Sequence, residues 1–583
     1  APGIVRAEPP AAGAVLTGVP VSPGAAAGPA RLLRRRAVVA PGRAAADPPA
    51  EWSALERALE ATAADVRRAG AAVGARAAAA DAAIFDAHLL FLEDDALLVP
   101  ARAGVFDRHE TAARAWTDAV SAAAEVWHGL EDPYQRARAT DLRDVGEQVL
   151  AHLAGPGETT AVVEAGDVVV APDLAPADVA ALASSAVAGI ALAHGGPASH
   201  AAILARALGL PAVAGAGEAL LAVPDGTALL VDGDAGAVTV APPSEAVAEV
   251  ARRRALQARA TAEARAAATA PAVTRDGVTV RVEANIAGPQ DVPAALAGGA
   301  DGVGLLRTEY LFLDAATMPG EDEQAAAYSA VAEALGGRPL TVRTLDAGAD
   351  KPLAFLAPAA EANPFLGVRG LRLSLAQPGL LRTQLRAVLR AAAGHDLRVM
   401  FPMVSTVDEL RRAREILDEA RASLRDEGVA TPAELEVGVM LEVPSAALVA
   451  EKLAPLVAFF SVGSNDLTQY TLAAERGNAA VAALSDPLHP AVLRLIRLTA
   501  EAAAAAGRRM AVCGEVAGDR LAVPLLIGLG VTELSMNAVA IPAAKQAVRA
   551  TDAARAAGLA EQALDAESAA AVRRLLAAAA PSA

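Results

Sequence analysis

A histidine at the start of a predicted helix is the first residue of this sequence that suggests chemistry. His200 ends the turn Gly-Gly-Pro-Ala-Ser-His, which His194 opens, and the apolar residues after it recur at helical spacing. The first turn of a helix carries unpaired N–H groups and partial positive charge, which would stabilise a phosphoryl group on the imidazole. A capping histidine beside a tight turn is the alternative, and the turn by itself does not decide between them.

Polar and reactive residues also follow several short apolar segments in the C-terminal half of the chain. They are Arg307, Arg343, Asp346, Glu442, Asn465, Asp466 and Cys513. Taken singly, each has a structural explanation: an arginine can form a surface ion pair, and a cysteine can be a small buried hydrophobic residue. In barrels of parallel strands, however, catalytic groups follow the carboxyl ends of different strands. The repeated placement therefore predicts that these side chains belong to one site.

The chemistry of these residues converges on a small anion and a metal ion. Three arginines could bind a multiply charged anion: Arg307, Arg343 and Arg476. Their guanidinium groups match the geometry of phosphate and carboxylate oxygens. Glu442 and Asp466 offer hard oxygen ligands suited to Mg²⁺. A thiol with an ordinary pKa of about 8.5 is mostly protonated at neutral pH, so Cys513 could donate a proton.

The composition bounds the class of protein. A chain of 583 residues is too long for one hydrophobic core, and its length indicates about three or four domains. The net charge of −17 and the aromatic content of 3% argue against a nucleic-acid-binding surface, which needs basic groups and stacking rings. The lone cysteine excludes an intramolecular disulfide, and there is no long uncharged apolar run. We therefore expect a cytoplasmic protein without a membrane span.

The pattern of the sequence changes several times, from strand-like segments to long helices and back, and predicts an α/β domain interrupted by a helical insertion. Such insertions are tolerated at exposed loop tips. The predicted parts are a disordered lead-in (1–13), an α/β domain (14–35 and 155–243), a helical domain (36–154), a linker helix (244–271) and a C-terminal domain (272–583).

Eight apolar segments alternate with helical segments in the C-terminal domain. They are residues 278–286, 302–306, 340–345, 398–403, 435–441, 459–462, 509–512 and 533–536. Eight strands separated by helices predict a closed (β/α)8 barrel. A doubly wound open sheet uses the same alternation and is the alternative.

One segment of the helical domain combines apolar and acidic side chains. Residues 81–98 are predicted as a single helix that carries Phe85, His88, Leu89, Leu92, Glu93, Asp94 and Asp95. This mixture suits a partner protein with a basic rim around an apolar contact. A stripe that faces the core, with a solvated acidic end, is the structural alternative.

Six stretches of the chain carry a family resemblance. They are Gly195–His200 with Ala205–Arg206, Leu305–Glu309, Arg343–Asp346, Asn363–Arg369, Gly463–Tyr470 and Cys513–Glu515. Together they resemble the phosphoenolpyruvate–protein phosphotransferase family, Enzyme I of the bacterial sugar phosphotransferase system, from about residue 16 to residue 544. The resemblance implies a multidomain α/β protein. A swivelling phosphohistidine α/β domain with an inserted all-helical domain would precede a (β/α)8 TIM barrel.

The resemblance also implies roles for individual residues. His200 would take the phosphoryl group of phosphoenolpyruvate (PEP) on Nε2 and pass it to the phosphocarrier protein HPr, and Cys513 would protonate the departing enolate. The implied substrate-binding residues are Arg307, Arg343, Asn465, Asp466 and Arg476, and the implied Mg²⁺ ligands are Glu442 and Asp466. The helical domain would dock HPr through Phe85, His88, Glu93 and Asp94, and the barrel would form a homodimer.

Two departures and two rival interpretations accompany the resemblance. Ala198 stands where relatives commonly have threonine, and Ala349 replaces a usual glycine. Pyruvate phosphate dikinase and phosphoenolpyruvate synthase share the histidine domain and the barrel, but a large ATP-binding domain precedes them. A regulatory scaffold without activity is the other rival, and the presence of all the reactive residues named above argues against it.

Overall fold

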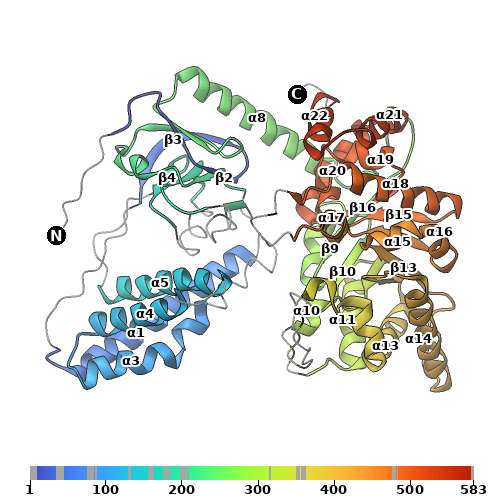
Figure 1. Cartoon of the computed structure of the whole chain (residues 1–583), viewed down its shortest axis with the longest axis horizontal. Coiled ribbons are helices and arrows are strands. Elements are labelled where there is room, and N and C mark those ends of the chain that lie inside the picture. Colours follow the sequence, from blue (N-terminus) through green and yellow to red (C-terminus); the bar gives the residue numbers. More distant parts are fainter. Residues whose placement is uncertain are drawn as a thin grey trace. The chain divides into compact units, whose positions relative to one another are not determined.

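The computed structural model divides into two compact units, residues 1–257 and 258–583, and each is described by itself (Figure 1). The described residues are 9–33, 45–74, 85, 88–128, 133–154, 163–174, 182, 185–196, 202, 205–206, 209–313, 315, 317–348, 353, 355, 361, 363–475, 481 and 484–579.

The first unit contains an eight-stranded mixed sheet. Its parallel centre consists of β3 (Ala25–Leu32), β4 (Val168–Ala171), β5 (Gly189–Leu192) and β6 (Ala212–Ala214). Antiparallel pairing adds β7 (Ala228–Asp232), β8 (Ala237–Val240) and β1 (Val15–Thr17) on one side and β2 (Val19–Ser22) on the other. Strand β4 is buried on both faces, because Val168 and Val170 pack into one apolar cluster and Val169 and Ala171 into another.

A helical block lies between β3 and β4 in the sequence, so the predicted insertion into an α/β domain is confirmed. Its helices are α1 (Pro48–Gly74), α3 (Asp95–Phe106), α4 (Ala112–His128) and α5 (Pro133–Leu153). They share an apolar core around Trp116, which is fully buried and donates from its indole nitrogen to the Gly146 carbonyl oxygen at 3.1 Å. A long helix, α8 (Ser244–Ala266), follows β8.

The prediction of one continuous helix over residues 81–98 is wrong at Glu93 and Asp94. Asp94 has extended backbone angles (φ −74°, ψ 120°) and caps the new helix α3, because its carboxylate accepts a hydrogen bond from the Ala96 N–H at 2.8 Å. A short acidic side chain competes for backbone donors in this way and favours a helix start over a helix interior. Residues 81–84, 86 and 87 of this predicted helix lie outside the described residues.

The second unit is a closed barrel of eight parallel strands. In barrel order they are β9 (Arg281–Ile286), β10 (Val303–Arg307), β11 (Leu340–Arg343), β12 (Leu397–Phe401), β13 (Glu436–Leu441), β14 (Phe459–Val462), β15 (Arg509–Val512) and β16 (Glu533–Met536). The last strand pairs with the first, Glu533 with Arg281 through Met536 with Ala284. This pairing confirms the predicted (β/α)8 barrel and excludes the open doubly wound sheet.

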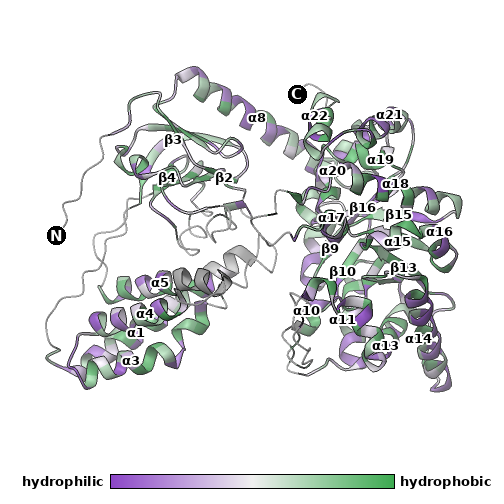
Figure 2. Cartoon of the chain, viewed as in Figure 1, coloured by the Kyte–Doolittle hydropathy of each residue, from purple (hydrophilic) through white to green (hydrophobic). Residues whose placement is uncertain are grey.

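Helices surround the barrel strands. They are α9 (Val292–Ala297), α10 (Glu309–Leu313), α11 (Glu321–Ala334), α12 (Gly370–Ala376), α13 (Pro378–Ala391), α14 (Val407–Asp426), α15 (Pro444–Leu448), α16 (Ala450–Leu453), α17 (Ser464–Leu472), α18 (Pro490–Ala505), α19 (Val523–Gly528), α20 (Ile541–Ala550), α21 (Ala553–Leu564) and α22 (Ala569–Ala579). Figure 2 shows apolar strands and a polar outer helix, α14. The helices bury their apolar residues against the outward side chains of the strands.

The barrel interior is built in layers, because successive strand residues point alternately inward and outward. An apolar layer contains Leu305, Met400, Met440, Phe459 and Cys513. Nearer the amino ends of the strands, an ionic layer pairs Arg281 with Glu283 (3.0 Å), Arg398 with Glu436 (3.1 Å) and Arg509 with Glu533 (3.5 Å). The apolar layer thus separates two polar ends of the barrel.

One carboxylate joins the two sides of the seam at which the barrel closes. Asp301, just before β10, accepts the ammonium of Lys545 on α20 at 2.7 Å and the Val282 N–H of β9 at 2.9 Å. Lys545 is fully buried. A buried ammonium is tolerated only when a carboxylate pairs with it, so this contact is part of the closed barrel.

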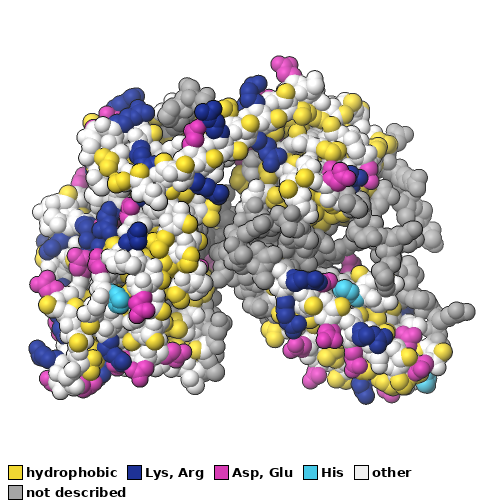
Figure 3. All heavy atoms as spheres, turned by 180° about the vertical axis from the view of Figure 1, so that it is seen from behind, with side chains coloured by type: hydrophobic (Ala, Val, Ile, Leu, Met, Phe, Trp, Pro, Cys, Tyr) yellow, Lys and Arg dark blue, Asp and Glu magenta, His cyan; other side chains and the backbone are white. Residues whose placement is uncertain are grey.

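Among the described residues, no helix combines the length and the apolar character that crossing a membrane requires. On the face drawn in Figure 3, basic and acidic side chains of the described residues are interspersed with apolar ones.

We predict that Asp301→Ala destabilises the second unit strongly, because it leaves the Lys545 ammonium buried without its carboxylate. The expected loss is about 3 kcal/mol of unfolding free energy, measured by urea titration. The matched control is Glu451→Ala, which removes a carboxylate from an exposed lysine pair with Lys452 and should cost less than about 1 kcal/mol. Equal losses in the two variants would contradict the role of the buried pair.

Candidate active site

The carboxyl end of the barrel brings together the polar residues that follow its strands. Arg307 and Arg343 are the last residues of β10 and β11. Glu442 directly follows β13, and Cys513 directly follows β15. Asn465 and Asp466 lie in the first turn of α17, which begins after β14. Because all eight strands are parallel, these side chains lie at the same end of the barrel.

Arg343 is a buried arginine with two carboxylate partners. Its guanidinium lies 2.6 Å from Glu309 Oε1 and 3.2 Å from Asp346 Oδ2. Burial lowers the pKa of Arg343, but the neighbouring carboxylates of Glu309 and Asp346 outweigh burial and raise the pKa above its ordinary value. Arg343 is therefore a fixed cation inside the barrel, not the surface ion pair that was its structural alternative.

Arg369 is a second buried arginine, which the pattern of polar residues at strand ends does not predict. Its Nη2 donates to both oxygens of Asp346 at 3.2 and 3.1 Å. Its Nη1 lies 3.4 Å from Asp466 Oδ1 and 3.3 Å from the Tyr470 hydroxyl oxygen. Arg369 follows an irregular loop and not a strand, but it ends the family-like stretch 363–369, which was the available signal. Asp346 thus links Arg369 to Arg343.

Glu442 is buried within electrostatic reach of these arginines and is held by the backbone. Its Oε1 accepts a hydrogen bond from the Met403 N–H at 2.7 Å. Met403 has a φ of 55°, an uncommon left-handed conformation for a residue other than glycine, and it directs this N–H at the carboxylate. A Cβ on Gly463 would come within 2.6 Å of Glu442 Oε2, so any larger residue there would displace this carboxylate. The Met403 N–H therefore holds one oxygen of Glu442, and Gly463 leaves room for the other.

The electrostatic surroundings of Glu442 oppose its ionisation. Burial, together with the carboxylates of Asp466 and Asp346, raises the pKa of Glu442 to about 8, although Arg343 and Arg369 favour the charged form. Two carboxylates that repel each other in a buried site are suited to share a cation. The described residues hold no group of three or more His, Cys, Asp or Glu side chains with metal-site geometry. A divalent cation at Glu442 and Asp466 would complete its shell with substrate and water oxygens, as small hard cations do.

Cys513 is buried in the apolar layer of the barrel. Its thiol donates to the Val462 carbonyl oxygen at 3.5 Å. Burial raises the pKa of the Cys513 thiol to about 11; the nearby Ser461 hydroxyl lowers it and Glu442 raises it further. The expectation of an ordinary thiol pKa is therefore wrong, because the sequence does not show how fully the sulfur is desolvated. The thiol keeps its proton at neutral pH, as the proposed acid requires.

Of the remaining predicted site residues, only some belong to the described part of the chain. Asn465 lies nearer the solvent, where its amide nitrogen bonds Glu515 Oε1 at 3.2 Å and its oxygen accepts the Glu515 N–H at 3.3 Å. His200 and Arg476 lie outside the described residues. His194, at the start of the turn that leads to His200, pairs with Glu218 at 2.7 Å.

The predicted partner-binding residues separate into buried and exposed groups. Phe85 and His88 are buried, with 2% and 1% of their surfaces exposed, so they face the core of the first unit as the structural alternative held. Glu93 is exposed, while Asp94 is half-buried and caps α3. The exposed acidic end of the segment is the part that a partner could reach.

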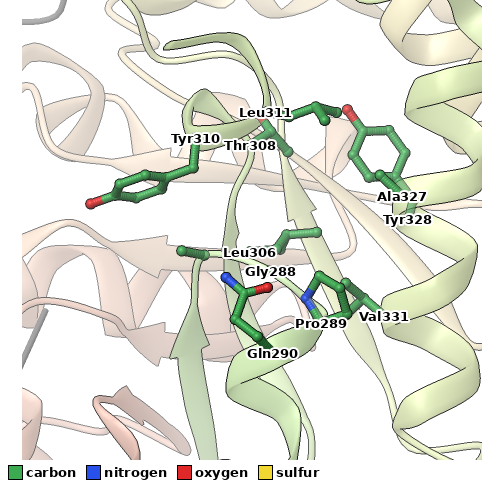
Figure 4. Close-up of a pocket in the computed structure, with 11 residues that line it drawn as sticks. Gly288, Pro289, Gln290, Leu306, Thr308, Tyr310, Leu311, Ala327, Tyr328 and Val331 are labelled. Carbon is green, nitrogen blue, oxygen red and sulfur yellow. The ribbon is translucent and has the colours of Figure 1, made fainter. Parts of the chain in front are cut away.

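A cavity of about 210 Å³ lies next to β10 and α11. It is lined by Ala287, Gly288, Pro289, Gln290, Leu306, Thr308, Tyr310, Leu311, Ala327, Tyr328 and Val331. In Figure 4 the rings of Tyr310 and Tyr328 lie on opposite sides of the view, with Gln290 below them. A lining this apolar does not suit a multiply charged anion, which the arginines at the barrel end would bind instead.

Known protein families match this chain in both of its units. Three family models of PEP-utilising enzymes match in succession: the N-terminal domain at residues 17–138, the mobile domain at 163–236 and the PEP-binding domain at 261–553. The PEP-binding match covers the barrel and every strand-end residue described above.

Individual relatives indicate which kind of PEP-utilising enzyme the chain resembles. The phosphoenolpyruvate-protein phosphotransferase of Staphylococcus carnosus is 42% identical over 83% of this chain and 84% of its own length. That of Streptococcus equinus is 40% identical over 94% and 96%. The multiphosphoryl transfer protein of Xanthomonas campestris is 47% identical over 86% of this chain and 59% of its own length. The chain belongs to the phosphoenolpyruvate-protein phosphotransferase family, and the resemblance seen in the sequence is confirmed.

We predict that Glu442→Gln changes how stability depends on pH in metal-free buffer. The folded pKa of about 8 lies above the ordinary value of 4.5, so the folded chain binds this proton more tightly than the unfolded chain. Glu442 therefore contributes stability that is complete at low pH, falls between these two pKa values and is lost above the higher one. Glutamine cannot ionise, so the variant should gain unfolding free energy relative to the parent from about pH 5 to about pH 8.5.

Urea unfolding in the presence of a chelator measures this difference. Glu451→Gln, at an exposed position, is the control and should show a difference that does not change with pH. A flat difference for Glu442→Gln as well would show that the Glu442 carboxyl titrates normally.

Proposed function

We propose that this chain transfers the phosphoryl group of PEP to its own His200 and then to the histidine of HPr, with release of pyruvate. This is the first step of the PEP-dependent sugar phosphotransferase system. The observation that carries the proposal is the buried linkage Arg343–Asp346–Arg369–Asp466 beside Glu442 and Cys513. It combines an anion site, a cation site and a proton donor at one end of a barrel whose family uses PEP.

The arginines act on the phosphoryl group. Arg307 and Arg343 bind its oxygens and stabilise the charge that spreads over them during transfer. In this step the bond between phosphorus and the enol oxygen of PEP breaks, and a bond to Nε2 of His200 forms. Asn465, Asp466 and Arg476 contribute to substrate binding. Because Arg343 is already held by Glu309 and Asp346, it needs little reorganisation when the substrate arrives.

Mg²⁺ is the cation that we assign to Glu442 and Asp466. When bound, it would supply positive charge that offsets the charge of the substrate and the repulsion between the two protein carboxylates. The backbone N–H of Met403 would hold Glu442 in place when the cation binds.

Cys513 completes the reaction by protonating the enolate. The buried thiol, with its pKa of about 11, is protonated when the enolate forms. It gives its proton to C3 of the enolate, which produces the methyl group of pyruvate and leaves a thiolate. The thiolate regains a proton from solvent before the next turnover.

The remaining assignments concern the chain's surroundings. We place HPr at the exposed acidic residues Glu93 and Asp95 of the helical block, because opposite charges steer association. We also propose a cytoplasmic location, a homodimer formed through the barrel, and the domain limits given in the sequence analysis. They rest on the composition and on the family resemblance.

We predict that the chain, incubated with PEP and Mg²⁺, yields pyruvate and an acid-labile phosphoprotein in a one-to-one ratio. His200→Ala should abolish both products, since the acceptor nitrogen is gone, whereas His395→Ala, at a histidine on another part of the barrel, should retain both. Labelled phosphate on the protein and enzymatic assay of pyruvate give the two readings. Phosphorylation that persists in His200→Ala, or that requires ATP, would refute the proposal.

We predict that the double variant Glu93→Lys/Asp95→Lys weakens phosphoryl transfer to HPr but leaves autophosphorylation unchanged. Reversing two exposed charges should raise the KM for HPr about tenfold. Asp94 is left intact because its loss would remove the cap of α3. Glu125→Lys, an exposed change on α4, is the matched control. Equal losses of transfer and autophosphorylation would rule out docking at this surface.

A further inference from the structure

Ser461 is a buried hydroxyl that faces the barrel interior close to Cys513. It lies in β14 and has 1% of its surface exposed. Phe459, two residues earlier, belongs to the same interior cluster as Cys513, so strand alternation turns Ser461 inward as well. Ser461 pairs in register with Ala511 of β15, two residues before Cys513. The two side chains therefore face the same interior space from neighbouring strands.

The Ser461 hydroxyl is free to donate a hydrogen bond. No hydrogen-bond partner for its oxygen occurs among the described residues, and a buried hydroxyl left unbonded is costly. The Ser461 hydroxyl lowers the pKa of Cys513, so it favours the thiolate form. The neighbouring residue Val462 accepts the thiol proton through its carbonyl oxygen at 3.5 Å. Two successive residues of β14 thus offer the sulfur one acceptor and one donor.

We propose that Ser461 is a positioning residue for Cys513, which stabilises the sulfur after it has given up its proton. The proposal rests on the proposed function. Before transfer, the thiol donates to the Val462 carbonyl oxygen. On transfer the S–H bond breaks, the enolate's electron pair forms the new C3–H bond, and the S–H electron pair stays on sulfur. The Ser461 O–H then donates to this thiolate until a water molecule restores the proton.

The charged groups around Cys513 divide in their effect on the thiolate. Glu442 disfavours it, whereas Arg343 and Arg307 favour it. Ser461 differs from all three because it is neutral. Removing its hydroxyl leaves the net charge of the site unchanged, so a change in thiol behaviour would report the hydrogen bond and not a rearranged field.

The chain contains one cysteine, so thiol chemistry of the intact protein reports Cys513 alone. The test compares the parent with Ser461→Ala, Ser461→Thr, which keeps a hydroxyl, and Ser374→Ala. Ser374 is a matched control, because it is also fully buried with no hydrogen-bond partner among the described residues, but it lies on the outer helix α12. The pH dependence of iodoacetamide alkylation is followed by mass spectrometry without substrate. The ultraviolet absorbance of the thiolate, relative to Cys513→Ala, gives the same titration without a reagent.

Ser461→Ala should lower the thiolate fraction about tenfold at a given pH, while Ser461→Thr and Ser374→Ala should resemble the parent. Ser461→Ala should also slow the exchange of the methyl protons of pyruvate in D₂O. It should still form phosphohistidine from PEP at the parent rate in a single turnover. An unchanged thiolate titration in Ser461→Ala, or an equal shift in Ser374→Ala, overturns the proposal. The titration uses no PEP, so it still decides the role of Ser461 if the parent chain proves unable to phosphorylate His200.

Discussion

Charge sharing among buried side chains holds the candidate site in place. Asp346 lies between Arg343 and Arg369, and Arg369 reaches on to Asp466. A buried charge without a partner costs several kcal/mol, so each of these groups is tolerated because the next one is present. The same pairing fixes the guanidinium groups before any substrate arrives. Preorganisation of this kind is what makes electrostatic stabilisation effective in an enzyme.

The barrel supplies the surroundings that this charge sharing needs. Inward-facing Met400, Met440 and Phe459 form an apolar layer directly beneath the site. Cys513 belongs to that layer, and burial is the largest influence on the pKa values of both Cys513 and Glu442. One structural feature, the inward alternation of strand residues, therefore accounts for the rigidity of the site, its dryness and its perturbed titration.

Much of this could be predicted from the sequence, and the rest could not for definite physical reasons. Strand periodicity gave all eight barrel strands, and polar residues at strand ends gave Arg343 and Glu442. Arg369 was missed because it follows an irregular loop, where no periodic pattern indicates direction. The backbone of Met403 could not be foreseen, since a positive φ at methionine has no sequence signal. Asp94 was placed inside a helix because apolar spacing continues across it, although its carboxylate starts a new one.

The contact between Asp301 and Lys545 also bears on how the protein is made. The two residues are 244 positions apart, and β9 and β16 pair across the same seam. On the ribosome, β9 emerges long before its final neighbour exists, so the growing barrel has an unpaired strand edge and an open apolar interior. Unpaired edges and exposed apolar surface are the features that nascent-chain chaperones protect and that promote misassembly. Translation that pauses before Lys545 would leave the chain in that vulnerable, unclosed form.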